Sequence, residues 1–390
     1  MELAPVDTAQ RRPVVDLTDE EARRVLPLKW GVPDDVIPAW VAEMDYAVDP
    51  VVLEAVQRLL AHGIVGYPVF GWDPVLAESY AAWSVRQFGW APAPAAVHPV
   101  SDVTAGVRLA IDVFSEPGAV VYPTPGYNAQ FGLAGVTGRE EVQLAVPPEA
   151  DHAEIDLDHL DRLLAQGART LILTQPHNPW GRVFTRAELE GIRDVVVRHG
   201  ARVVSDEIHA PLVLPGADHL SYLAIDGTHD HAVAVVAASK AFNTAGLRCA
   251  QLVVPDVGAQ QVLVDQPASR NDSYSPLGVT AARAAYDHGD PWLASLVERL
   301  DQQRTLLADL LATHLPEVRM RPLQATYLAW LDASDYGHDD PAAVALERGR
   351  VRVSPGDDYA PGSTGHVRLN IATSAARLTE IVERLAKAWT

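Results

Sequence analysis

The chain has 390 residues, enough for two or three domains. Its 48% hydrophobic and 21% charged residues are typical of a globular protein and exclude a disordered or fibrous chain. Its 51 acidic residues outnumber its 31 basic residues, and the formal charge of −20 disfavours binding to nucleic-acid phosphates or anionic membranes. The single cysteine, Cys249, excludes an intrachain disulfide and a cysteine-rich zinc site, so we expect no metal. No apolar run has the length of a signal-peptide core or a membrane span, and we expect a cytoplasmic protein.

Capping residues mark the predicted helices. Asp-Pro pairs begin helices at residues 49 and 73, and glycines end these helices at residues 63 and 89. Another helix begins in the sequence SDVTAGVRLAI. A capping box formed by Thr185 and Glu188 begins a helix that Gly200 ends.

Short apolar runs rich in β-branched residues alternate with these helices. They cover residues 119–122, 171–174, 202–205 and 232–238. Such runs are typical of strands that are buried on both faces. The alternation therefore predicts an α/β fold, in which a parallel sheet is covered by helices on both sides.

The pattern changes after residue 285. A long amphipathic helix over 290–314 is followed by strands at 326–331, 351–354 and 367–371, and by a last helix from residue 375. We therefore expect a large domain over residues 49–285 and a smaller α+β domain over residues 286–390. We expect residues 1–48 to form an arm that packs with the smaller domain.

Polar residues follow several predicted strands at their carboxyl ends, where ligands bind in an open parallel sheet. Asn178 follows the strand 171–174, Asp206 the strand 202–205, and Lys240 the strand 232–238. Each residue alone has an ordinary interpretation, as a turn residue, a capping residue or a solvated strand end. Together they indicate one ligand in one crevice.

The residue types point to pyridoxal 5'-phosphate (PLP). A desolvated lysine has a lowered pKa and a free amine for Schiff-base chemistry, and an aspartate can keep a pyridinium nitrogen protonated. Asn178, Asp206, Lys240 and Arg248 are separated by 28, 34 and 8 positions, in the motifs PHNPWGRV, VVSDEIH and ASKAFNTAGLR. Over nearly its whole length, the chain resembles the fold-type-I PLP enzymes of the class I/II aminotransferase superfamily.

The resemblance implies a mostly parallel, seven-stranded sheet in the large domain and roles around the cofactor ring. Lys240 would carry the cofactor and move protons, Asp206 would bind the pyridine nitrogen, and Asn178 would bind the phenolic oxygen and contact substrate. Tyr127, in PTPGY, would stack on the ring. Many members have a tyrosine where this chain has His209, which would serve as a second donor to the ring oxygen through an N–H.

The resemblance also implies a phosphate site and a carboxylate site. The phosphate would be bound by side chains and by the start of a helix, namely by Arg248, Ser239 and the backbone N–H groups of Val103 and Thr104. Many members have a further serine where this chain has Ala237. Arg368, in GHVRLNIATS, would bind the substrate carboxylate, because a planar guanidinium can make two parallel hydrogen bonds.

Two motifs in the N-terminal third and one in the middle of the chain resemble one branch of the superfamily. LKWGVPDDVIPAWVAEMDY, HGIVGYP and SDEIHAPLVLPGADH are similar to the C–S β-lyases of the cystathionine β-lyase type. By this resemblance, Ala42 and its neighbours in residues 40–46 line the substrate entrance. Tyr67 would act in catalysis by reaching the phosphate of the neighbouring subunit, which implies a homodimer with shared sites, although a tyrosine before Pro68 is also an ordinary turn residue.

The resemblance implies β-elimination from cystathionine or another S-substituted cysteine, with release of a thiol, pyruvate and ammonia. An aminotransferase acting on an amino acid and a 2-oxo acid would use the same residues and is the alternative function. A nicotinamide oxidoreductase is disfavoured by the lack of a G-x-G-x-x-G motif. A PLP-binding regulator is disfavoured because only about 28 residues precede the Lys29-Trp30 motif, and no basic DNA-binding segment is present.

Overall fold

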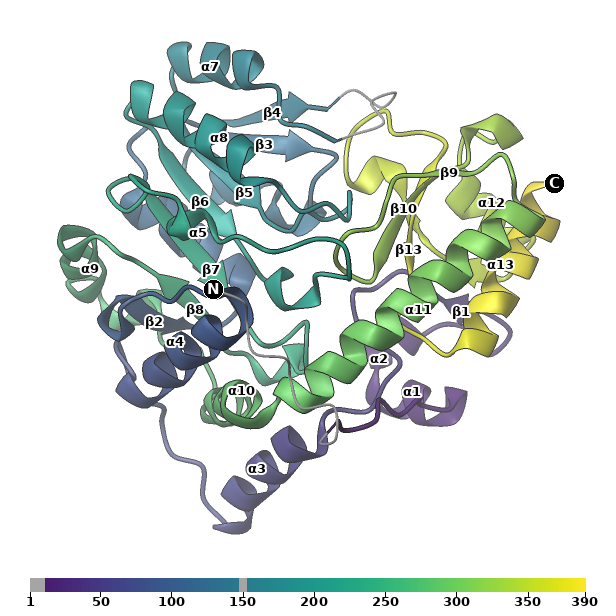
Figure 1. Ribbon diagram of the computed structural model, residues 1–390, viewed down its shortest axis with the longest axis horizontal. Coiled ribbons are helices and arrows are strands. Elements are labelled where there is room, and N and C mark those ends of the chain that lie inside the picture. Colours follow the sequence, from purple (N-terminus) through teal and green to yellow (C-terminus); the bar gives the residue numbers. More distant parts are fainter. Residues whose placement is uncertain (1–10, 147–152) are drawn as a thin grey trace.

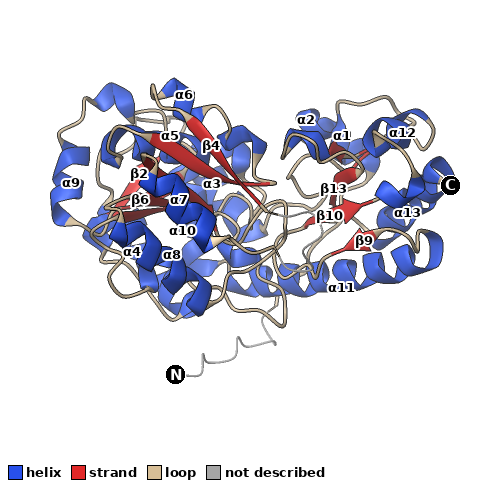
Figure 2. Ribbon diagram, turned by 90° about the horizontal axis from the view of Figure 1, so that it is seen from above, coloured by secondary structure: helices blue, strands red, loops and turns tan. Residues whose placement is uncertain are grey.

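The computed structural model describes residues 11–146 and 153–390, which form a large and a small domain (Figures 1 and 2). The first ten residues of the predicted arm lie outside the described residues. Figure 2 shows the two domains side by side, with the long helix α11 (Asp290–His314) running along both.

Within the described residues, seven strands form the sheet of the large domain, in the order β2-β8-β7-β6-β5-β3-β4. β8 runs antiparallel to both of its neighbours, and every other neighbouring pair in this sheet is parallel. The strands are β2 (Val97–Val100), β3 (Ala119–Thr124), β4 (Glu141–Ala145), β5 (Ala168–Thr174), β6 (Arg202–Asp206), β7 (Ala232–Val236) and β8 (Ala250–Val253). The predicted α/β fold with a mostly parallel sheet is confirmed.

Both faces of this sheet are buried, because alternate residues of each strand enter different hydrophobic clusters. Val204 and Val235 pack with α5 (Val103–Phe114) on one face, whereas Val203 packs with α8 (Arg186–Arg198) on the other. The remaining helices of the large domain are α3 (Pro50–Ala61), α4 (Pro74–Phe88), α6 (Leu133–Val136), α7 (Leu157–Ala165), α9 (Val257–Val264) and α10 (Pro276–His288).

Helix α5 lies unusually close to the sheet. A Cβ atom on Gly106 would lie only 2.7 Å from Cγ1 of Val235 in β7, so a larger residue would push the helix away. The close packing fixes the amino end of α5 beside the carboxyl ends of the parallel strands.

The small domain is built on an antiparallel sheet, in the order β12-β13-β10-β9, whose strands are β9 (Arg319–Met320), β10 (Leu328–Asp332), β12 (Ser354–Pro355) and β13 (His366–Asn370). Its helices are α11, α12 (Pro341–Glu347) and α13 (Ala375–Trp389). The N-terminal segment contains α1 (Asp19–Val25), α2 (Pro27–Trp30) and β1 (Ile37–Pro38). β1 pairs in parallel with β11 (Val351–Arg352), so this segment packs on the small domain. The domain boundary between residues 285 and 286 stays a prediction; Gly289, three residues later, lies between α10 and α11.

Two predicted strands of the small domain are wrong in their limits. Residues 351–354 are not one strand, because β11 pairs with β1 whereas β12 pairs with β13 in another sheet. The strand predicted from Thr326 begins at Leu328, because Thr326 has a φ of 74°, which lies in the left-handed region and is incompatible with an extended strand.

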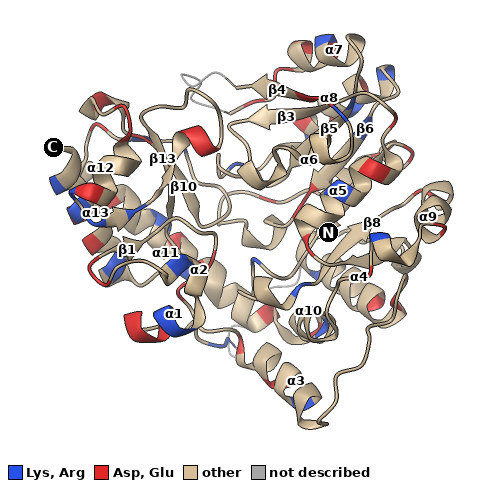
Figure 3. Cartoon of the chain, turned by 180° about the vertical axis from the view of Figure 1, so that it is seen from behind, with Lys and Arg blue, Asp and Glu red and all other residues tan. Residues whose placement is uncertain are grey.

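Charged residues of both signs are distributed over the surface (Figure 3). Among the described residues, no helix is long and apolar enough to cross a membrane, and no group of three or more His, Cys, Asp or Glu side chains could hold a metal ion. The cytoplasmic location stays a prediction.

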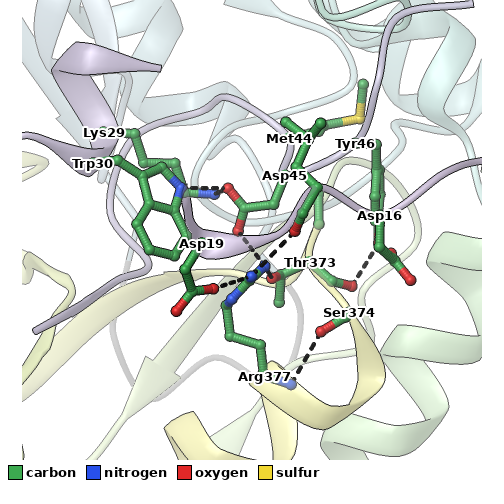
Figure 4. A network of polar contacts seen from close by, with 12 residues as sticks. Asp16, Asp19, Lys29, Trp30, Met44, Asp45, Tyr46, Thr373, Ser374 and Arg377 are labelled. Atoms are coloured by element: carbon green, nitrogen blue, oxygen red, sulfur yellow. Dashed lines mark hydrogen bonds and ion pairs between the residues drawn. The ribbon is translucent and has the colours of Figure 1, made fainter. Parts of the chain in front are cut away.

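A buried ion pair lies within the N-terminal segment, and Arg377 of the small domain reaches the same carboxylate (Figure 4). Lys29 Nζ donates to Asp45 Oδ1 at 2.8 Å, and both side chains are only 1% exposed. The indole N–H of Trp30 donates to the same oxygen at 2.8 Å, and Arg377 of α13 lies 3.5 Å from Asp45 Oδ2. Burial lowers the pKa of Lys29, and the charge of Asp45 opposes this shift. The carboxylate of Asp45 is therefore the group that keeps the buried ammonium charged.

We expect Asp45→Asn to lower the free energy of unfolding by about 3–5 kcal/mol, because the change leaves a buried lysine without its counter-ion. Glu20→Gln is the control, since Glu20 pairs with Arg24 on α1 while both side chains remain mostly exposed. This control should lose less than about 1 kcal/mol. Urea unfolding followed by tryptophan fluorescence measures both values, and equal losses would contradict the structural importance of the buried pair.

Candidate active site

A cavity of about 180 Å³ lies at the carboxyl ends of β5, β6 and β7. Its lining contains most of the predicted site residues, namely Ala42, Val103, Thr104, Tyr127, Asn178, Asp206, His209, Ser239, Lys240 and Arg248. Segments far apart in the sequence therefore meet at one edge of the sheet, where parallel strands direct their following loops.

Asp206 is the last residue of β6 and is only 1% exposed. Its Oδ2 accepts the side-chain N–H of Gln130 at 2.6 Å, and its Oδ1 accepts the backbone N–H of Ile208 at 3.1 Å. Burial raises the pKa of Asp206 to about 7, while the two hydrogen bonds oppose this shift. A cationic partner in the cavity would favour the ionised carboxylate.

Lys240 follows β7 and reaches toward the small domain. Its Nζ donates to the backbone oxygen of Ala42 at 2.8 Å, and the hydroxyl of Tyr327 donates to the same oxygen at 3.0 Å. The pKa of Lys240 is lowered to about 8, mainly by burial; the charge of Arg368 acts in the same direction, whereas the charges of Glu43 and Asp206 oppose the shift. About a tenth of Lys240 is therefore a neutral amine at pH 7, far more than for a lysine with the ordinary pKa.

The start of α5 and the loop after β7 form a site suited to an anion. Asp102 caps α5 by accepting the N–H of Ala105 at 2.8 Å. The N–H groups of Val103 and Thr104 belong to the first helical turn, where helix geometry provides no acceptor. Arg248 lies beside them and donates to Asp102 Oδ2 at 2.7 Å. Helix N–H groups and a guanidinium together are typical of a phosphate site.

Tyr127 and His209 contribute to the walls of the cavity. Burial raises the pKa of Tyr127, so its hydroxyl stays protonated. Burial lowers the pKa of His209 to about 3, and the positive charges of Lys240 and Arg368 act in the same direction. His209 is therefore neutral, and its Nδ1 has no hydrogen-bond partner within the described part of the chain.

Arg368 is a buried cation on β13 of the small domain. Its Nη1 donates to Asn178 Oδ1 at 3.2 Å, its Nη2 donates to the backbone oxygen of Trp40 at 2.7 Å, and its guanidinium lies over the ring of Tyr359. Among the described residues, no carboxylate forms an ion pair with it, and its Nε has no acceptor. A buried guanidinium with these properties is suited to binding a carboxylate ligand.

Residues 39–46, which we call the strap, pass between the two domains beside the cavity. Asn370 of the small domain donates to the backbone oxygens of Val41 and Glu43. Asn243 of the large domain donates to the oxygens of Met44 and Tyr46. The strap is therefore fixed from both sides by backbone hydrogen bonds, and it contains the predicted substrate-contacting residue Ala42.

Tyr67 is the one predicted catalytic residue that does not line this cavity among the described residues. It lies in the segment after α3 and is 91% exposed. Its predicted role concerns the site of a second subunit, so this position leaves that role a prediction.

The site residues fit PLP by their chemistry. A lysine amine, a carboxylate for a ring nitrogen, an amide and a neutral histidine for a ring oxygen, and an anion site surround one cavity. The unpartnered Nδ1 of buried His209 is a free polar atom of the kind that a ligand oxygen would satisfy.

Sequence reasoning did not identify Gln130, Tyr327 or Asn370 as part of the site. Gln130 lies three residues after Tyr127 in the same loop, so its position after a strand end was the available signal. Tyr327 and Asn370 act on backbone oxygens of the strap, and such contacts have no local sequence pattern.

Comparisons with known proteins agree with this geometry. The family model for aminotransferase class I and II matches residues 36–385. Cystathionine beta-lyase of Corynebacterium glutamicum is 34% identical over 94% of this chain and 98% of the relative, and cystathionine beta-lyase PatB of Bacillus subtilis is 33% identical over 91% and 92%. The crystal structure of cystalysin from Treponema denticola, which contains pyridoxal 5'-phosphate, has a TM-score of 0.89 at 25% identity, covering 96% of this chain and 98% of that one. The chain belongs to the aminotransferase class I and II family.

Proposed function

We propose that the protein is a PLP-dependent carbon–sulfur β-lyase that acts on cystathionine or another S-substituted cysteine and releases a thiol, pyruvate and ammonia. The observation that carries the chemistry is the meeting of Lys240, Asp206 and Asn178 in one cavity beside the buried Arg368, which forms no ion pair with a carboxylate in the described part of the chain. The relatives named cystathionine beta-lyase, which match along more than nine-tenths of the chain, support the lyase reaction.

Arg368 and Asn178 orient the substrate in this proposal. The substrate carboxylate completes the hydrogen bonding of the guanidinium, while Asn178 Oδ1 holds Nη1 in place at 3.2 Å. With its Oδ1 engaged, the amide N–H of Asn178 is free to donate to the cofactor's phenolic oxygen. The carboxylate position then directs the Cα–H bond of the substrate toward Lys240.

Lys240 is the attachment point of the cofactor and the base that removes the α-proton. When bound, PLP supplies an electron sink for the electron pair of the broken Cα–H bond. Asp206 supports this sink by keeping a proton on the pyridine nitrogen. The lowered pKa of Lys240, about 8, leaves neutral amine for proton removal, and Ala42 oxygen accepts a hydrogen bond from the free amine.

The β-elimination follows from loss of the proton. The Cβ–S bond breaks and its electron pair leaves with sulfur, and the ammonium form of Lys240 is the nearby acid that can protonate the thiolate. Aminoacrylate is the released product, and water hydrolyses it to pyruvate and ammonia. An aminotransferase would instead return the proton to the cofactor carbon and would require a 2-oxo acid as second substrate.

We expect the purified protein to release pyruvate and ammonia from L-cystathionine without any added 2-oxo acid. Lys240→Ala should reduce this rate by a factor of about 10² or more, because it removes the proton-transfer group. Coupled pyruvate detection measures the rate, and borohydride reduction followed by peptide mapping identifies the residue that carries the cofactor. A requirement for a 2-oxo acid, with accumulation of its amino product, would favour the aminotransferase alternative.

We expect Arg368→Lys to raise KM for the substrate about 10- to 100-fold with a smaller effect on kcat, because an ammonium cannot form the two parallel hydrogen bonds. Arg352→Lys is the matched control. Arg352 also lies beside Trp40, with its guanidinium 3.8 Å from the ring centroid, whereas Arg368 donates to Asn178, which lines the cavity. The KM of Arg352→Lys should stay within about twofold of that of the unmodified protein. Equal increases of KM in the two variants would contradict the role of Arg368.

The surface near Tyr67 supports a homodimer. The segment from His62 to Trp72 contains no charged residue other than histidine, and Figure 3 shows it without acidic or basic colour between α3 and α4. Its apolar residues are exposed, with Ile64 at 74% and Tyr67 at 91%. Exposed apolar patches of this kind mark interaction surfaces.

The anion site also remains open in one chain, because the side chain of Arg248 is 61% exposed. A second copy of the chain would cover the apolar segment and would bring a hydroxyl donor, Tyr67, to the phosphate. We therefore propose a symmetric dimer in which each site uses Lys240 of one chain and Tyr67 of the other.

Mixing Lys240→Ala protein with Tyr67→Phe protein under subunit exchange tests this arrangement. A mixed dimer then has one site with both changes and one site with neither, so its activity should exceed that of both parents. Mixing Lys240→Ala with Asp206→Ala is the control, because both residues line the same cavity of one chain and no intact site can form. With exchange shown by differently tagged chains and Tyr67→Phe itself impaired, activity that only averages the parents would contradict the shared site.

A further inference from the structure

Gln130 is a buried amide, 3% exposed, in the short turn Asn128–Gln130 after β3, and its side chain contacts the last residues of β5 and β6. Its Nε2 donates to Asp206 Oδ2 at 2.6 Å, and its Oε1 accepts the hydroxyl of Thr174 at 3.4 Å. Thr174 ends β5, and Asp206 lies opposite it in the sheet. The hydroxyl and the carboxylate therefore fix opposite ends of one amide group.

The orientation of this amide follows from the two contacts. The Asp206 carboxylate can only accept hydrogen bonds, so the amide must present its N–H to it. The amide oxygen of Gln130 therefore faces Thr174 and accepts a hydrogen bond from its hydroxyl. The second oxygen of Asp206 is held by the N–H of Ile208 at 3.1 Å. Both carboxylate oxygens thus receive a donor, and the plane of the carboxylate is fixed.

We propose that Gln130 is a positioning residue of the active site, whose amide N–H holds Asp206 as an oriented anion facing the ring nitrogen of bound PLP. Only the effect of Gln130 on catalytic turnover rests on the proposed function; its contact with Asp206 does not. A hydrogen bond to the charged form of an acid stabilises that form, and the bond to Gln130 is short for an N–H donor.

Several other charged or titratable groups act on Asp206. Glu207, the next residue, and the burial of the site both raise its pKa, whereas Lys240 and the bonds from Ile208 and Gln130 lower it. Tyr127, which follows β3, interacts electrostatically with Asp206 and stays protonated. Loss of the Gln130 donor should therefore raise the pKa of Asp206 and shift the shared proton from the ring nitrogen toward the carboxylate.

The experiment uses the holoenzyme with ¹⁵N in the pyridine ring of its PLP. In Gln130→Met, which has a similar size and no donor, the ratio of protonated to unprotonated ring nitrogen near neutral pH should fall about tenfold relative to the unmodified protein. The matched control is Gln303→Met. Gln303 is equally buried but donates to the backbone oxygens of Ile371 and Thr373 in the small domain. An unchanged ratio in Gln130→Met, or an equal fall in Gln303→Met, would overturn the proposal.

A second measurement on the full chain without PLP separates this inference from the proposed function. The carboxyl ¹³C signal of Asp206 should titrate about one unit higher in Gln130→Met and higher still in Gln130→Glu, which keeps the shape but brings a second carboxylate. If these shifts occur while cystathionine is not cleaved, the lyase assignment fails and the role of Gln130 stands. If Gln130→Met does not fold, Thr174→Val replaces it and should give a smaller shift in the same direction, whereas no shift would overturn the proposal.

Discussion

Parallel pairing of three neighbouring strands is the constraint on which the active site depends. In the sheet, Thr174 of β5 lies opposite Asp206 of β6, and Asp206 lies opposite Val235 of β7. The loops that follow begin at the same level, so Asn178 and Lys240 are delivered to the same edge as Asp206. Because both faces of the sheet are covered, these polar groups enter an environment poor in water, which changes their acidity. Burial raises the pKa of Asp206 and lowers that of Lys240. The two pKa values therefore lie closer to each other and to neutral pH than those of the free side chains.

The small domain adds a cation to this arrangement. Arg368 projects from β13, pairs with no carboxylate among the described residues, and contacts Asn178 of the large domain. The strap lies between the domains and is itself fixed by the buried pair of Lys29 and Asp45 at one end. Hydrogen bonds from Asn243 and Asn370 fix its backbone from the two domains. The guanidinium of Arg368 and the amine of Lys240 are thus held by one continuous set of contacts.

Much of the fold was predictable because capping residues and buried apolar runs are local signals. The helices that begin at Asp49, Asp73 and Thr185 follow the expected limits closely. The strands β2 and β4 were not predicted, since β2 contains a proline and β4 is a partly exposed edge strand. These strands depend on pairing with distant segments, and short sequences do not encode such pairing.

In the site, too, residues with a local sequence signal were predictable and residues that depend on distant contacts were not. Lys240, Asp206 and Asn178 were predictable because they follow strands in recognisable motifs. Gln130, in contrast, touches Asp206 across 76 positions of sequence, and Tyr327 touches Ala42 across 285 positions. Their importance comes from a three-dimensional contact, and the residue types glutamine and tyrosine are common in cores and on surfaces.

The strap contributes to the site mainly through peptide oxygens. The oxygen of Ala42 accepts hydrogen bonds from Lys240 and Tyr327, and the oxygen of Trp40 accepts them from Arg368 and Ser354. A peptide oxygen is present whatever side chain the residue carries. Evolution can therefore replace Ala42 and leave this acceptor in place, provided that the path of the backbone is preserved. Side-chain scanning of such a segment would report on backbone geometry, and replacing the peptide bond by an ester at the next residue would weaken the acceptor itself.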